Sequence, residues 1–261
     1  MRSMNIAATG MMAQQTNVEV IANNIANLNT TGFKRQRAEF QDLLYQSERR
    51  GGATSSDTGT IVPVGVQVGI GVKTAAVYRI TTQGNLTQTG NPLDLAIQGR
   101  GFFQILQPDG TTAYTRAGSF QLSPTGEIVT ADGFVVQPGI TVPQNTIAIS
   151  VNSSGQVQAQ VAGQTQPSTV GQLELANFPN EAGLEALGNN LFLETPASGT
   201  PVTGNPGATG FGSLNQGLLE TSNVDIVSEI TNLITAQRAY EMNSKVIQTS
   251  DQMMSTLSQV Q

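Results

Sequence analysis

The chain has 261 residues, a formal net charge of -6, and neither His nor Cys. Their absence excludes imidazole general bases, thiolate nucleophiles, Cys zinc sites and disulfides. Only 11% of the residues are charged, and an acidic balance argues against nucleic acid as a partner. The carboxylates are scattered and lack the spacing of a calcium loop. We therefore expect no catalytic, cofactor-binding or metal-binding residue.

A seven-residue hydrophobic repeat predicts an N-terminal helix over about residues 1–32, as in a coiled coil. The repeating positions are Met4, Met11, Val18 and Ile25, and a companion stripe carries Ile21 and Leu28. Asn27 and Gly32 are residue types that adopt the left-handed conformation that ends many helices. We expect the helical domain to end there.

Residues 33–72 are expected to form an extended connector, and residues 73–195 a β-rich domain. Gly110, Gly118, Gly126 and Gly133 recur at intervals of seven or eight residues, and two of them follow Asp. Asp-Gly turns between short apolar runs are typical of an antiparallel meander. Further strands are expected at Phe102–Leu106, Ile147–Val151, Gln156–Val161, Leu173–Phe178 and Leu191–Leu193.

A stretch rich in Gly, Pro and Thr, residues 196–221, predicts a return linker. A second helix is expected over residues 222–261, with Ser222 and Asp225 resembling a capping box. Its repeating positions are Ile226, Leu233, Tyr240, Ile247 and Met254, with Ile230 and Leu257 beside them. The expected fold class is therefore α+β, with long terminal helices forming a coiled-coil-like domain and a β-rich middle joined by extended segments.

Both helical stripes are narrow and diluted with Gln, Asn, Ser and Thr, so neither helix is stable alone. Two arrangements satisfy this pattern. The helices pack on each other within one chain, or they stay mobile in the monomer and become ordered when many subunits stack. The second is favoured, because coupled folding suits weakly apolar ends.

Three segments of the chain resemble the bacterial flagellar rod and hook family. They are ANNIANLNTTGFKRQRAEF at residues 22–40, GNLTQTGNPLDLAIQGRGFFQI at 84–105 with its continuation AYTRAGSFQLSPTGEIVTADGFVV, and ETSNVDIVSEITNLITAQRAYEMNSKVIQTSDQMM at 220–254. Three blocks in the family's order make a specific match. The signature positions in the first block are Ala22, Asn23, Asn24, Asn27, Gly32 and Phe33.

The resemblance implies a structural, self-assembling subunit and not an enzyme. Its terminal helices would form an inner tube around an axial export channel, with the β-domain outside. The chain is shorter than the family's hook subunit. Residues 45–63 resemble an insertion associated with a straight, stiff rod, at the positions Tyr45, Arg49, Ser55 and Pro63. A proximal rod or hook subunit is the alternative within the family.

The resemblance also implies a place in the flagellar basal body, crossing the periplasm to the outer membrane. Export would use the flagellar type III apparatus without a cleaved signal, and the N-terminus has no signal-like apolar core. The implied partners are identical copies, proximal rod subunits, the hook, surrounding ring proteins, the export apparatus and a rod cap. Neither nucleic-acid binding nor membrane insertion is expected.

Two other classes of function remain open from the residues alone. A carboxylate-dependent glycan hydrolase would need a facing pair of acids, which sequence spacing does not show. A monomeric secreted β-module would have little use for heptad-patterned helices at both ends.

Overall fold

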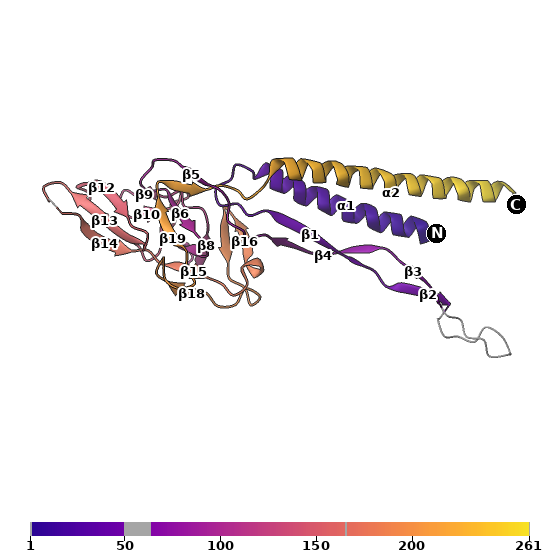
Figure 1. Ribbon diagram of the computed structural model, residues 1–261, viewed down its shortest axis with the longest axis horizontal. Coiled ribbons are helices and arrows are strands. Elements are labelled where there is room, and N and C mark those ends of the chain that lie inside the picture. The colour runs from indigo at the N-terminus through magenta and orange to yellow at the C-terminus, as the bar shows by residue number, and fades with distance from the viewer. Residues whose placement is uncertain (1, 50–63, 165, 261) are drawn as a thin grey trace. The chain divides into compact units, whose positions relative to one another are not determined.

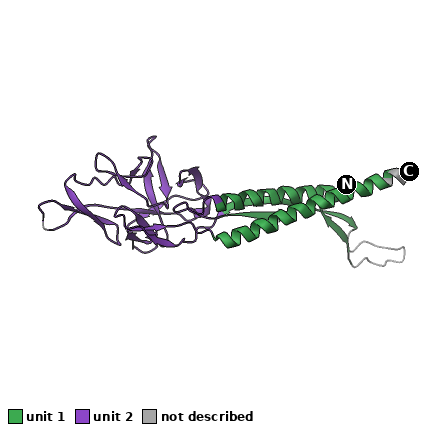
Figure 2. Cartoon of the chain, turned by 90° about the horizontal axis from the view of Figure 1, so that it is seen from above, with its two compact units in different colours: residues 1–25, 36–78, 225–261 green, residues 26–35, 79–224 purple. Residues whose placement is uncertain are grey.

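The computed structural model describes residues 2–49, 64–164 and 166–260, which form two compact units. Unit 1 contains residues 1–25, 36–78 and 225–261, and unit 2 contains residues 26–35 and 79–224 (Figure 2). The chain therefore passes between the units four times. The predicted α+β class, with two terminal helices and a β-rich middle, is confirmed (Figure 1).

Two long helices dominate unit 1, namely α1 (Arg2–Ala26) and α2 (Ile226–Val260). Asp225 caps the start of α2, because its side chain accepts a hydrogen bond from the backbone N–H of Val227 at 3.1 Å. The prediction that the helix starts with a Ser222 cap was wrong. Ser222 lies in the segment before the helix, where its hydroxyl accepts a hydrogen bond from the backbone N–H of Val224 at 3.4 Å.

Four strands complete the described part of unit 1. They pair two by two, β1 (Gln36–Asp42) with β4 (Val72–Arg79) and β2 (Tyr45–Arg49) with β3 (Val66–Gly69). Every residue of β2 is exposed. The residues expected as an extended connector therefore contain paired strands.

Unit 2 consists of short strands and one 3-10 helix, η1 (Glu181–Gly183). Its strands are β5 (Leu86–Gln88), β6 (Leu95–Gln98), β7 (Phe102–Leu106), β8 (Thr112–Thr115), β9 (Gln121–Leu122), β10 (Ile128–Val129), β11 (Val135–Val136), β12 (Thr146–Val151), β13 (Gln156–Val161), β14 (Ser168–Gln172), β15 (Leu175–Asn177), β16 (Glu185–Gly188), β17 (Leu191–Leu193), β18 (Val202–Gly204), β19 (Ser213–Gln216) and β20 (Leu218–Glu220). Three of the expected strands, β7, β13 and β17, have the predicted bounds.

The largest sheet has nine strands and runs in the order β16-β17-β8-β7-β11-β10-β9, with β15 joining β7 and β18 joining β15. A second sheet contains β12-β13-β14, and two further pairs are β19-β6 and β20-β5. The expected return linker thus contains three strands: β18 pairs with the nearby β15, whereas β19 and β20 pair with β6 and β5, far earlier in the chain. Its Gly and Pro content resembled a linker, but distant partners decide its structure.

The core of unit 2 lies on both faces of β7. Phe103 packs edge-to-face on Phe120, with ring centroids 5.0 Å apart, within the main apolar cluster. On the other face, Phe102 belongs to a smaller cluster with Tyr114 and Phe178. Gly118 is required for close approach, because a Cβ there would lie 1.7 Å from the carbonyl oxygen of Leu95. The glycine pattern therefore marks packing as well as turns.

Candidate assembly interface

Small and polar side chains make the contact between α1 and α2. Ser3 is hydrogen-bonded to Ser250, and Asn24 to Glu229, each at 3.2 Å. Between these pairs, a Cβ at Gly10 would lie 2.9 Å from the side-chain amide nitrogen of Asn243. The pairs advance along α1 in steps of seven or fourteen residues and retreat equally along α2, so the helices are antiparallel. The three pairs are Ser3 with Ser250, Gly10 with Asn243, and Asn24 with Glu229.

Although Leu233 and Ile247 are half-buried, most of the large apolar side chains of α2 are exposed instead. At about 100° per residue, they fall on two flanks of the polar seam that faces α1. The first flank carries Ile226, Val227, Ile230 and Ile234, and the second carries Met242, Val246 and Met253; their exposed fractions range from 43% to 70%. An amphipathic helix normally turns its apolar face to its own core. In α2 this arrangement is reversed, which leaves apolar flanks for another partner.

The positions expected to pack divide into three groups. Ile21 is buried, and seven others are half-buried: Met4, Met11, Val18, Ile25, Leu28, Leu233 and Ile247. Four are exposed: Ile226, Ile230, Tyr240 and Met254. The side chain of Leu257 lies outside the described part. The sequence pattern did not single out Val227, Ile234, Met242 or Val246, although all four belong to the exposed flanks.

Asn24, one of the signature positions, is buried and joins three parts of unit 1. Its side-chain oxygen accepts a hydrogen bond from the backbone N–H of Gln36 at 2.8 Å, and its Nδ2 donates to the Gln36 carbonyl at 2.9 Å. The same Nδ2 donates to Glu229 of α2. This amide therefore fixes the start of β1 against both helices. Two other signature positions, Ala22 and Asn23, are exposed on α1.

Unit 2 contains a buried cluster of three charges. Glu220 is 1% exposed, and its carboxylate accepts hydrogen bonds from Lys34 Nζ at 2.6 Å and from Arg116 Nε at 2.5 Å. Arg116 also donates to the carbonyls of Ile97, Gly99 and Gly101 at 2.5 to 3.1 Å. This charge clasp, Lys34–Glu220–Arg116, joins the N-terminal segment of unit 2 to its last strand.

The electrostatics of the charge clasp favour an ionised Glu220. Burial by itself raises the pKa of Glu220, but the charges of Arg116 and Lys34 outweigh this and hold the pKa below its ordinary value. Burial lowers the pKa of Lys34, and Glu220 opposes that shift. The carboxylate is thus the group on which the two buried cations depend.

Of the remaining signature positions, Gly32 and Phe33 lie beside the charge clasp, and Asn27 lies in the turn after α1. Gly32 has φ of +68°, and its N–H donates to the backbone carbonyl of Glu220 at 2.8 Å. A Cβ at Gly32 would lie 2.8 Å from the backbone nitrogen of Ala117, so only glycine fits. The backbone carbonyls of Asn27 and Phe33 accept hydrogen bonds from Thr30 and Asn223 respectively.

Asn223 links three segments of unit 2 beside the charge clasp. Its Oδ1 accepts a hydrogen bond from the backbone N–H of Arg35 at 2.7 Å. Its Nδ2 donates to the carbonyls of Ile80 at 2.8 Å and Thr82 at 3.0 Å. These residues adjoin three of the four points at which the chain passes between the units.

The segment expected to contribute to rod stiffness, residues 45–63, is only partly described. Tyr45 and Arg49 are exposed at the two ends of β2. Ser55 and Pro63 lie outside the described residues.

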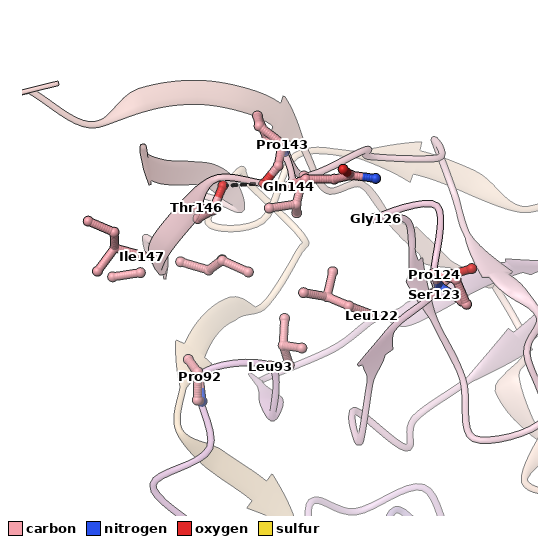
Figure 3. Close-up of a pocket in the computed structure, with 13 residues that line it drawn as sticks. Pro92, Leu93, Leu122, Ser123, Pro124, Gly126, Pro143, Gln144, Thr146 and Ile147 are labelled. Atoms are coloured by element: carbon pink, nitrogen blue, oxygen red, sulfur yellow. Dashed lines mark hydrogen bonds between the residues drawn. The ribbon is translucent and has the colours of Figure 1, made fainter. Parts of the chain in front are cut away.

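A shallow groove on unit 2 lies between β9 and β12 (Figure 3). It has a volume of about 440 Å³ and includes Pro92, Leu93, Leu122, Pro143 and Ile147. None of its lining residues is charged or titratable, so it offers no acid–base chemistry. Within the described residues, no group of acidic side chains is arranged to hold a metal ion. Of the helices described, none combines the length and hydropathy of a membrane span.

Comparison with known proteins identifies the family. The models "Flagella basal body rod protein", "Flagellar hook protein FlgE/F/G D1 domain" and "Flagellar basal body rod FlgEFG protein C-terminal" match residues 4–34, 96–159 and 215–260. The flagellar basal-body rod protein FlgG of Caulobacter vibrioides is 64% identical over 260 residues, which cover 100% of this chain and 99% of that protein. The chain belongs to the flagellar basal-body rod protein family.

Other members of the rod family are nearly as similar. FlgG of Agrobacterium fabrum is 57% identical over 258 residues, covering 99% of this chain and 98% of that protein. FlgG of Buchnera aphidicola subsp. Schizaphis graminum is 51% identical over 258 residues, covering 99% of both.

Sequence reasoning missed the charge clasp. Its members fall in three different family segments: Lys34 in the first, Arg116 in the second and Glu220 in the third. Each matching block contains further charged residues, so no pattern in the sequence singled out these three.

Proposed function

We propose that copies of this rod protein polymerise helically into the distal rod, a stiff hollow shaft that transmits torque from the motor to the hook and encloses the axial export channel. As a member of the rod family, the protein is a structural subunit of the flagellar basal body. Its role is mechanical and involves no catalysis. A proximal rod or hook subunit remains the alternative assignment.

The reversed amphipathicity of α2 is the observation that supports polymerisation. Its polar positions meet α1, while its two flanks of large aliphatic and Met side chains are exposed. Burying one such side chain contributes about 1.5–3 kcal/mol. Repeated for every subunit of a lattice, these contacts would give the shaft its stiffness. Monomeric soluble proteins rarely expose so many apolar side chains on one helix, and exposed apolar surface of this kind marks an interaction site.

The proposed partners follow from a place in the rod. They are identical copies, proximal rod subunits, the hook, the surrounding periplasmic and outer-membrane rings, and, during assembly, the export apparatus and the rod cap. The shaft would cross the periplasm to the outer membrane. Residues 45–63 are proposed to contribute to its straightness.

Electron microscopy of the purified chain tests the proposal. The wild-type protein should form helical filaments in a concentration-dependent manner. Ile230→Asp should remain folded but fail to polymerise, since a charge buried at an interface without a partner is strongly unfavourable. Asn232→Asp, which places the same charge two residues away at an already polar position, is the matched control. Filament formation by Ile230→Asp equal to that of the control would contradict the role of the first flank.

A further inference from the structure

A groove along α1 lies within unit 1 and has a volume of about 510 Å³. One wall is formed by α1, including Met12 and Glu19, and the other by Leu43, Val72 and Lys73. Met12 is 70% exposed although it lies in a groove with apolar walls. An apolar groove beside a helix is a common receptor for the apolar stripe of a second helix.

The groove opens on the side of α1 that faces away from α2. At about 100° per residue, Met12 and Glu19 lie roughly 180° around the helix from Gly10, which meets α2. The chain's own α2 contributes no residue to the groove. A helix bound there must come from another molecule.

The second flank of α2 is an exposed apolar stripe of the kind that such a groove binds. Met242, Val246 and Met253 fall within about 40° of one another on the helix, and all are exposed. Such a stripe, with spacings of four and seven residues, is the pattern of helix-in-groove binding.

Charge complementarity supports the same match. Glu19 is the only acidic residue of α1, and it is exposed in the groove. Arg238 and Lys245 are the only basic residues of α2, and they lie within about 60° of Met242. Neither forms a side-chain hydrogen bond or ion pair within the described part of the chain. The groove also carries the exposed base Lys73 on its other wall, so binding is favoured only in the register that places Arg238 and Lys245 beside Glu19 and away from Lys73.

We propose that the Met242–Val246–Met253 flank of α2 binds in the α1 groove of a second copy of this chain, with Arg238 and Lys245 facing Glu19. The inference rests on the proposed function and specifies one contact within the polymer. The proposed contact is head-to-tail, which leaves a free groove at one end and a free stripe at the other. Where the rotation between copies does not close into a ring, such a contact extends into a helical filament in which α1 and α2 of successive copies alternate.

Charge reversal tests the pairing. Glu19→Lys should raise the concentration needed for polymerisation about tenfold or more, because it sets like charges against each other. The double variant Arg238→Glu/Lys245→Glu should do the same, and the triple variant should restore polymerisation. Glu174→Lys, an exposed residue of unit 2 with the same change of charge, is the matched control. Sedimentation and negative-stain microscopy measure the polymer.

The outcomes separate the two proposals. A wild-type chain that stays monomeric at high concentration overturns both. Wild-type filaments together with unimpaired Glu19→Lys filaments overturn the groove contact alone and leave the groove to another partner. Failure of the triple variant to recover, with all variants folded by circular dichroism, also overturns the contact.

The absence of cysteine allows a second measurement. Met12→Cys/Val246→Cys should give a ladder of disulfide-linked oligomers in assembled material, while each single variant gives none. Dimers from Met12→Cys alone would show a two-fold symmetric contact and refute the proposal. A cross-link formed within one chain would refute it equally.

Discussion

Replacing Glu220 by Gln should destabilise unit 2 more than any other single loss within the charge clasp. The amide keeps the size of the side chain but removes the only anion that Lys34 and Arg116 share. Both cations are almost fully buried, at 4% and 5% exposure. They would then face each other with no compensating charge.

The expected magnitude follows from this burial. Removing one partner of a buried ion pair costs about 3–5 kcal/mol, a large part of the roughly 5–15 kcal/mol that stabilises a domain. At about 2–4 °C per kcal/mol for a domain of this size, Tm should fall by roughly 10 °C. Lys34→Met should cost less, about 1.5–3 kcal/mol, because it leaves Glu220 and Arg116 as a neutral pair.

Urea unfolding followed by circular dichroism measures these differences, and hydrogen exchange of β7 locates them in unit 2. Glu174→Gln, which removes an exposed carboxylate of the same unit, is the control and should change stability little. If Glu220→Gln were no more destabilising than Lys34→Met, the charge clasp would not depend on its shared anion, and the reasoning would fail.

Four other results are expected. The lowered pKa of Glu220 means that the unfolded chain takes up its proton first, so the free energy of unfolding of unit 2 should fall as the pH drops from about 5 toward 2; Glu220→Gln should show a weaker dependence in the same urea titration. Asn24→Ala should cost about 1–3 kcal/mol and speed hydrogen exchange at Gln36, whereas unchanged exchange would show that the amide does not hold β1. Ile247→Asp should block polymerisation while unit 2 stays folded, and normal filaments would count against its packing role. Deletion of residues 45–63 should give a polymer that bends more in electron micrographs; equal bending stiffness would remove the proposed role of that segment.

The helices and the β-rich middle were predictable because they depend on local patterns. Heptad spacing marked both helices, and glycine spacing marked the turns between strands. Which face of α2 contacts α1 was not predictable from the sequence. The apolar set containing Ile226 and the polar set containing Glu229 both repeat every seven residues. The general preference for burying apolar residues favours the apolar set, whereas the structure sets the polar one against α1.

Which segments come together in unit 2 was harder to predict, because this depends on contacts between residues that are far apart in the sequence. Lys34 lies directly after the predicted N-terminal helix, yet its buried partner Glu220 is 186 residues away. Strand β19, within the expected return linker, pairs with β6, so that Ser213 lies opposite Gln98. The local hydrophobic pattern of a segment does not indicate which distant segment it pairs with. The weak apolar content of these segments concealed that they are strands.

The long sequence separation within the charge clasp has a consequence for biosynthesis. A ribosome makes Lys34 early and Glu220 near the end, so the cation has no anion to bind during most of translation. The hydrogen bonds of Asn223 to Arg35 and Ile80 are delayed in the same way. A nascent or incompletely emerged chain therefore lacks the contacts that close unit 2, and closure waits for its last strand. Timing of this kind keeps unit 2 open until nearly all of its residues have been synthesised.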